Sequence, residues 1–279
     1  MQIDLENKGL TPKEKQELTL LLDSVNPRIT DDLEQIWYLI DKAWNDMGCD
    51  NKELDWEKIG LFYAHPVWLL NGLFIEQHAL SMHIRDSIAH YIATHIVGDR
   101  KLRICDYGGG FGTLSREIAR LCPQAHIDIY EPFPSQYGKA CIAAFSNITF
   151  VDKLQNETYD CLVCTDVLEH VDDVIGCFKG MLDSVKVGSS VLIGNCFYPV
   201  IACHLPKHFH FRYTFKLIAK TMGLKFEGVV SGASYVEIYT KVKPTRVSFI
   251  TKLTGGGEQV FICPHLHCET YCKAHFEAA

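Results

Sequence analysis

No stretch of this sequence is apolar over a length that would comfortably span a membrane. The most apolar segment covers residues 61–75, and it is interrupted by His65, Pro66 and Asn71. The first nine residues, MQIDLENKG, also lack the basic segment and the apolar core of a secretory signal peptide. We therefore expect a cytoplasmic protein that has no membrane partner.

Positive charge is also scarce. Lys and Arg number 27 against 34 Asp and Glu, which gives a formal net charge of −7 at pH 7. Because general binding to nucleic acid depends on Lys and Arg that neutralise phosphates, we expect no nucleic-acid partner. The 279 residues can bury one large core, or one core and a smaller helical domain. Association into a homo-oligomer is left open by the sequence.

The twelve cysteines lack the pattern of a disulfide-rich secreted domain. Cys105, Cys161, Cys164 and Cys196 all fall in predicted buried strands, where a free cysteine behaves as a small hydrophobic residue. We therefore expect reduced cysteines, as is usual for a cytoplasmic protein.

A strand, a glycine-rich turn, a helix and a second strand follow one another between residues 101 and 132. Leu102–Cys105 is a short apolar run that predicts a buried parallel strand. Residues 106–112, DYGGGFG, contain too much glycine for a helix or a strand. Thr113 is the predicted N-cap of the helix that follows, and Ile127–Tyr130 is the second strand. This order of elements is a βαβ unit whose turn can form half of a nucleotide site.

The residues of the turn have a physical role in such a site. Gly108, Gly110 and Gly112 lack a Cβ atom, so the backbone can adopt positive φ and a ligand can lie directly on it. Glu131 stands just after the second strand, where a carboxylate can accept hydrogen bonds from both hydroxyls of a ribose. The dinucleotide fingerprint G-x-G-x-x-G is absent, because its last position, counted from Gly108, is Thr113.

The spacing Asp106-x-Gly108-x-Gly110-x-Gly112, followed by an acid after the next strand, resembles the first motif of class I S-adenosylmethionine-dependent methyltransferases. The alternative is an ordinary glycine-rich turn of an α/β domain. The resemblance implies that S-adenosyl-L-methionine is the cofactor. It also implies a mostly parallel sheet whose last strand is inserted antiparallel.

Two further acids follow predicted strands. Asp152 comes directly after the predicted strand Ile148–Val151, and the resemblance implies a hydrogen bond from the adenine amine to this residue. The alternative for Asp152 is a solvated turn residue. The segment from Asp166 to His170, DVLEH, also resembles a motif of small-molecule methyltransferases, and places Asp166 and Val167 beside the cofactor.

Glu169 and His170 have two interpretations. A histidine–carboxylate pair beside a reacting centre is a reasonable base. The alternative, which we favour, is a structural role in orienting the loop.

The segment of residues 196–213 is dense in histidine and aromatic residues. In the family that the sequence resembles, this part of the chain borders the acceptor site. Tyr198, His204, His208 and His210 are therefore the catalytic candidates. Histidine titrates near neutral pH, so it suits a base where the acceptor must lose a proton. The sequence does not distinguish among these candidates.

Residues 1–97 are predicted to be helical and to form a cap over the sheet. Tyr63, His65, Trp68 and Asn71 form a mixture of aromatic and polar groups inside an apolar run, which is typical of a small-molecule pocket. A purely structural role for them is an equal alternative. The metalloprotease motif H-E-x-x-H is absent.

The end of the chain, Cys263–His275, concentrates cysteine and histidine, which are zinc ligands. Paired C-x-x-C motifs are absent, so we favour an ordinary terminal segment and predict no metal.

Together these observations predict an α/β protein with a Rossmann-like methyltransferase fold and a mostly parallel seven-stranded sheet. We expect a helical cap at 1–97, a cofactor-binding domain at 98–243 and a Cys/His-rich extension at 244–279. The predicted function is methyl transfer to a small-molecule or sugar-derived acceptor by in-line displacement. Two alternatives are a cyclase or lyase that releases methylthioadenosine from the same cofactor, and a non-catalytic binding module.

Overall fold

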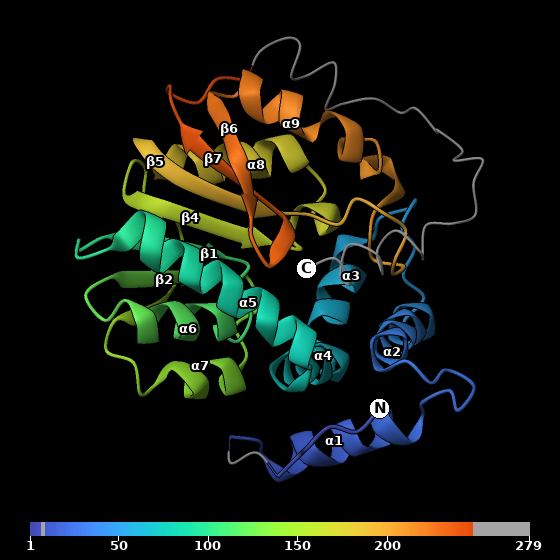
Figure 1. The fold of residues 1–279 in the computed structure, drawn as a ribbon. Coiled ribbons are helices and arrows are strands. Elements are labelled where there is room, and N and C mark those ends of the chain that lie inside the picture. Colours follow the sequence, from blue (N-terminus) through green and yellow to red (C-terminus); the bar gives the residue numbers. More distant parts are fainter. Residues whose placement is uncertain (7–8, 248–279) are drawn as a thin grey trace.

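The computed structural model describes residues 1–6 and 9–247. It contains a central sheet with helices on both faces, and a group of helices packed at one end of the sheet (Figure 1). The predicted terminal segment Cys263–His275 lies outside the described residues. Among residues 1–6 and 9–247, no helix combines the length and the hydropathy needed for a bilayer crossing.

Within the described residues, the sheet has seven strands in the order β3-β2-β1-β4-β5-β7-β6. The pairs from β3 to β5 are parallel, and β7 is antiparallel to both β5 and β6. The α/β fold and the antiparallel insertion predicted from the sequence are therefore confirmed. The strands are β1 (Arg103–Tyr107), β2 (His126–Tyr130), β3 (Ile148–Val151), β4 (Tyr159–Thr165), β5 (Val185–Gly194), β6 (Leu224–Val230) and β7 (Ala233–Lys241).

Successive side chains along each strand point to opposite faces of the sheet, and both faces are buried. In β1, Ile104 packs into one apolar cluster and Cys105 into the other, because successive side chains point to opposite faces. The first cluster includes residues of α5 (Ala79–Tyr91), α6 (Thr113–Leu121) and α7 (Gln136–Ile142). The second includes residues of α8 (Val174–Ser184) and α9 (Phe211–Thr221). Both faces are covered, as a parallel sheet requires.

The cap consists of α1 (Pro12–Asp23), α2 (Asp32–Asp46), α3 (Trp56–Tyr63) and α4 (Pro66–Gln77). These helices, blue in Figure 1, share an apolar core of their own, in which the rings of Trp44 and Phe62 meet edge to face at 5.0 Å. Thr11 begins α1 with a capping box to Glu14, as its position before Pro12 predicts.

Within the predicted helical region 1–97, the structure separates the last long helical stretch into two helices. His78 has an extended backbone, with φ −89° and ψ 118°, and separates α4 from α5. As a result α5 leaves the cap and packs on the sheet beside α6, and it continues as a short π-helix over Ile92–Val97.

Contacts between the cap and the sheet domain fix the cap over the glycine-rich turn. Glu76 of α4 forms an ion pair with Arg116 of α6, and it accepts hydrogen bonds from Thr113 Oγ1 at 3.0 Å and Tyr137 Oη at 3.4 Å. Gly72 of α4 lies against the ring of Phe111, so close that a Cβ atom there would overlap the ring. The cap therefore covers the carboxyl end of β1.

Candidate functional site

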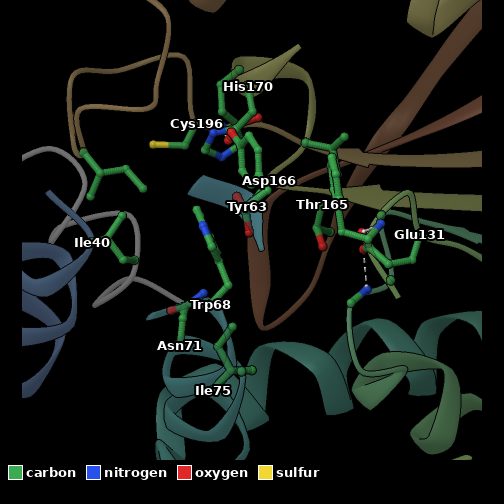
Figure 2. Close-up of a pocket in the computed structure, with 18 of the residues that line it drawn as sticks. Ile40, Tyr63, Trp68, Asn71, Ile75, Glu131, Thr165, Asp166, His170 and Cys196 are labelled. Carbon is green, nitrogen blue, oxygen red and sulfur yellow. Dashed lines mark hydrogen bonds between the residues drawn. The ribbon is translucent and has the colours of Figure 1, made fainter. Parts of the chain in front are cut away.

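A cavity of about 820 Å³ lies at the carboxyl ends of β1, β4 and β5 and beneath the cap (Figure 2). Ligands of open α/β sheets bind at this edge. The residues that line the cavity come from the glycine-rich turn and other strand ends, the cap helices, α5, β7 and the loop that follows β5. Its size lies near the upper end of the usual range for ligand pockets, about 300–1,000 Å³.

The glycine-rich turn exposes backbone to the cavity. Gly108 and Gly110 have φ of +73° and +54° and both line the cavity. A Cβ atom on Gly108 would lie 2.3 Å from Val167 Cγ2, so this position excludes any side chain. A Cβ atom on Gly110 would meet open space, and there glycine is required by the left-handed backbone alone.

Gly112 has a different role from the other two. It has φ of +72° and is the N-cap of α6, so the prediction that Thr113 is the N-cap was wrong by one residue. A Cβ atom on Gly112 would lie 2.7 Å from Ile129 Cδ1 and 2.9 Å from Ile142 Cγ2. Gly112 therefore packs the turn against β2 and α7, and it is not among the residues that line the cavity.

Glu131 places a carboxylate in the cavity just beyond β2. Its Oε2 accepts a hydrogen bond from Gly110 N and its Oε1 accepts one from Phe133 N, both at 3.0 Å. Burial raises the pKa of this carboxyl, and the two backbone hydrogen bonds oppose the rise. Each oxygen has a second lone pair, so the carboxylate can still accept one hydrogen bond at each oxygen. That capacity fits the two hydroxyls of a ribose.

Two more carboxyls lie at strand ends in the cavity. Asp106 accepts a hydrogen bond from Ser115 Oγ at 2.7 Å, and burial raises its pKa to about 6. Asp166 has φ of +56° and accepts a hydrogen bond from Tyr235 Oη at 3.3 Å, and burial raises its pKa to about 6 as well.

Arg85 of α5 opposes both of these pKa shifts by its positive charge. Among the described residues that line the cavity, it is the one that carries a permanently positive side chain. Arg85 is not one of the site residues predicted from the sequence, although it lies in a helical stretch rich in polar residues. The guanidinium of Arg85 could therefore form an ion pair with a carboxylate of a ligand.

Two histidines face each other at the far side of the strand ends. The rings of His170 and His204 have centroids 4.8 Å apart. His204 Nδ1 lies 2.7 Å from the carbonyl oxygen of Tyr198, and His170 Nδ1 lies 3.2 Å from that of Cys203. A carbonyl can only accept, so each Nδ1 carries the proton and each Nε2 has a free lone pair.

Burial keeps both of these rings neutral. It lowers the pKa of His204 to about 4, against the opposing effect of the Tyr198 carbonyl. It lowers the pKa of His170 well below its usual range, and the neighbouring His204 adds to that effect. At neutral pH, therefore, the cavity contains two uncharged imidazoles that can accept protons or hydrogen bonds.

Glu169 connects this pair to the loop after β5. Its side chain is fully buried, and Oε1 accepts a hydrogen bond from Cys196 N at 2.8 Å. Its carboxyl and the two imidazoles offer atoms that all lie within 4.8 Å of one another, a composition that could also hold a divalent cation. The absence of a metal stays a prediction.

The structure brings together some of the predicted site residues and separates others. Tyr198 and His204 line the cavity, as do Asp106, Gly108, Gly110, Glu131, Asp166 and Val167. His208 does not, because its Nε2 is hydrogen-bonded to the carbonyl of Val171 at 2.6 Å. His210 is the N-cap of α9 and stacks near Phe211, also away from the cavity. Asp152 is exposed beyond β3 and is not a lining residue.

The cap contributes Tyr63, Trp68 and Asn71 to the cavity wall. His65 instead caps α4, where its Nδ1 accepts a hydrogen bond from Val67 N at 3.1 Å. Three of the four side chains of this segment therefore line the cavity, and the lid interpretation stays a prediction.

The comparisons with known proteins agree with this geometry. Residues 77–199 match a protein family described as a methyltransferase domain. This stretch contains Arg85, the glycine-rich turn, Glu131 and the segment from Asp166 to His170. Over these residues the chain is similar to a methyltransferase domain, in agreement with the resemblance of its glycine-rich turn to class I S-adenosylmethionine-dependent methyltransferases. S-Adenosylmethionine is the cofactor of this family, and the bare backbone, the Glu131 carboxylate and the Arg85 charge fit its nucleoside and its amino-acid part.

Two curated relatives align with slightly more than half of the chain. They are ubiquinone biosynthesis O-methyltransferases from Rickettsia canadensis (strain McKiel) and Rickettsia felis (strain ATCC VR-1525 / URRWXCal2), each 26% identical over 155 residues. These alignments cover 52% of this chain, and 63% and 61% of the respective relatives. An O-methyltransferase family protein from Burkholderia thailandensis has a similar fold, with a TM-score of 0.52 at 15% identity, covering 76% of this chain and 71% of that one.

Proposed function

We propose that the whole chain is an S-adenosylmethionine-dependent methyltransferase that acts on a small molecule. One observation carries the proposal: the cavity joins the Glu131 carboxylate and the bare turn to the neutral His170–His204 pair. When bound, the cofactor supplies an electrophilic methyl group on a sulfonium sulfur. An acceptor placed between the cofactor and the histidines would then have a proton acceptor on its far side.

The residues of the domain divide into those that hold the cofactor and those that face the acceptor. In this proposal Gly108 and Gly110 let the cofactor lie on the backbone, and Glu131 accepts hydrogen bonds from the ribose hydroxyls. Arg85 pairs with the carboxylate of the methionine part. Asp166 and Val167 flank the nucleoside, as the resemblance of their motif implies.

His204 is the proposed proton acceptor. Its Nδ1 donates to the Tyr198 carbonyl at 2.7 Å, a closer contact than the 3.2 Å between His170 Nδ1 and the Cys203 carbonyl, so the protonated ring is better stabilised at His204. His204 Nε2 would take up the proton of the acceptor hydroxyl. The bound cofactor would supply the methyl group to the acceptor oxygen and keep the electron pair of the broken sulfur–carbon bond on sulfur. The protonated ring would lie beside the Glu169 carboxyl, which is within 4.8 Å.

The proposal is tested with the full chain, radiolabelled cofactor and a panel of small hydroxylated, amino and sugar acceptors. The expected result is S-adenosylhomocysteine together with a methylated acceptor, both detected by mass spectrometry. Methylthioadenosine formed in the absence of any acceptor would instead support the cyclase or lyase alternative. Calorimetric binding of S-adenosylhomocysteine without turnover of any acceptor would support a binding module.

We also propose that the protein works in the cytoplasm and has no nucleic-acid partner. None of the cysteines in the described part of the chain forms a disulfide, which supports a reducing compartment. The net charge of −7 supports the second point.

A further inference from the structure

Beyond the histidine pair the cavity continues into the cap. Its wall there is formed by Leu33, Trp37 and Ile40 of α2 and by Trp56 and Ile59 of α3. All of these side chains are apolar or aromatic, and none carries a charge. Ile40 and Ile59 are about 2% exposed, whereas Trp56 is 43% exposed, so this compartment runs from the cap core toward the surface. We call these five side chains the cap compartment.

Aromatic rings separate the cap compartment from the cofactor side of the cavity. Tyr63 lies between two of them, with ring centroids 5.2 Å from Trp68 and 5.8 Å from Phe133, and it stacks on the latter. His170 meets Tyr63 and Trp68 edge-on at 6.2 and 6.4 Å. Figure 2 shows Trp68 and Tyr63 between Ile40 on the left and Glu131 on the right, with His170 above them. A flat group fits such a set of rings better than a puckered one.

Two buried polar atoms in the wall of this cavity have no hydrogen-bond partner. Trp68 Nε1 is a donor and Asn195 Oδ1 is an acceptor, and both residues line the cavity. Buried polar groups are usually paired, so each unpaired atom calls for an explanation. A ligand that carries both an acceptor and a donor, such as a hydroxyl, would pair them.

We infer that the acceptor is an uncharged molecule with a flat hydroxylated head and an apolar tail, which rests on the proposed function. The head lies at Trp68, Asn195 and His204, and the tail lies in the cap compartment. A sugar does not fit this compartment, because its hydroxyl groups would be buried against apolar side chains without partners. A charged tail would be excluded for the same reason.

The probes for this inference are 4-alkylphenols with tails from two to eight carbons. Each has a counterpart of equal length that ends in a carboxylate. Binding to the full chain, saturated with S-adenosylhomocysteine, is measured by calorimetry. We expect affinity to rise about fourfold with each methylene until the compartment is filled, since each buried methylene contributes similarly. The carboxylate series should show no such rise.

Two variants test the two parts of the site separately. Trp37→Gln should flatten the dependence on tail length, whereas Tyr38→Gln, at the next position of α2, should leave it unchanged. Trp68→Phe keeps a ring but removes the donor, so it should weaken every alkylphenol by about tenfold without changing the dependence on length. Trp44→Phe, in the cap core away from the cavity, is its control.

The outcomes separate this inference from the proposed function. If the unmodified chain does not bind S-adenosylhomocysteine, the proposed methyltransferase function is wrong. If the chain binds that product and methylates a sugar or an amine, but alkylphenol affinity does not change with tail length, then the inference is wrong and the function stands. Equal alkylphenol affinities for the Trp68→Phe variant and the unmodified chain would also overturn the assignment of the head site.

Discussion

The carboxylate of Glu131 accepts a hydrogen bond from the backbone amide of Gly110 at 3.0 Å. This contact joins the end of β2 to the turn that follows β1, which lies 21 residues earlier in the sequence. The group proposed to hold the ribose and the backbone proposed to underlie the cofactor therefore form one unit. A change at either residue acts on both.

Replacement of Glu131 by Gln should weaken cofactor binding. The amide would present a donor to Gly110 N or to Phe133 N, so one backbone donor would lose its acceptor, and one ribose hydroxyl would lose its charged partner. We expect the affinity for S-adenosylhomocysteine to fall by about ten- to a hundredfold. Calorimetry with Glu117→Gln, on α6 outside the cavity, provides the matched control. Equal affinities for the two variants would contradict the role of Glu131.

Gly108→Ala should reduce both cofactor binding and stability, whereas alanine at a glycine in open space should not. At φ +73° the new Cβ atom would lie 2.3 Å from Val167 Cγ2, so the turn or the Asp166 loop would have to move. We expect cofactor binding to be lost, together with a fall in the free energy of unfolding of about 1–3 kcal/mol.

Gly180→Ala is the comparison for that variant. Gly180 lies within α8, where a Cβ atom meets nothing within 4 Å. Alanine favours helix, so we expect a gain in stability of about 0.5–1 kcal/mol and unchanged cofactor binding. Thermal denaturation in the presence and absence of S-adenosylhomocysteine measures both effects. Similar losses for the two variants would contradict the steric explanation.

His204 and His208 were equivalent candidates in the sequence, and the structure distinguishes them. His204→Gln should lower kcat by about 10²–10⁴-fold, because the proposed proton acceptor is removed, while cofactor affinity stays the same. His208→Gln should change kcat little, since the His208 ring is bonded to Val171 and lies outside the cavity. The two kcat values, measured with the same acceptor, decide between them. A larger loss at His208 would reverse the assignment.

The parts of the site that could be predicted are those encoded locally. The strand, the glycine-rich turn and the acid after the next strand all lie within residues 101–132, and their spacing alone placed Gly108, Gly110 and Glu131 at one strand edge. Asp166 followed in the same way from a strand end. The carboxyl ends of parallel strands lie at the same edge of the sheet. Residues that follow these strands therefore come close together regardless of how the helices pack.

The remaining features depend on contacts between distant segments. Arg85 reaches the cavity because the chain turns at His78 and directs α5 onto the sheet, and nothing in the helical periodicity marks that turn. His204 and His208 are four positions apart in the same histidine-rich segment, so the sequence alone does not separate their roles. In the structure the Val171 carbonyl is hydrogen-bonded to His208 Nε2, whereas the Tyr198 carbonyl is hydrogen-bonded to His204 Nδ1 and leaves its Nε2 available.

His208 should also make the protein sensitive to acid. Burial lowers its pKa to about 4 in the folded state, whereas it titrates near 6.5 when unfolded. The unfolded chain therefore binds the proton first, and stability is lost as the pH falls from about 6.5 toward 4. At pH 5.0 the loss from this group amounts to about 2 kcal/mol relative to pH 7.5. His208→Gln cannot take up that proton, so the difference in unfolding free energy between these two pH values, measured with urea, should shrink by about that amount. A difference equal to that of the unmodified chain would show that the buried ring of His208 does not control the acid response.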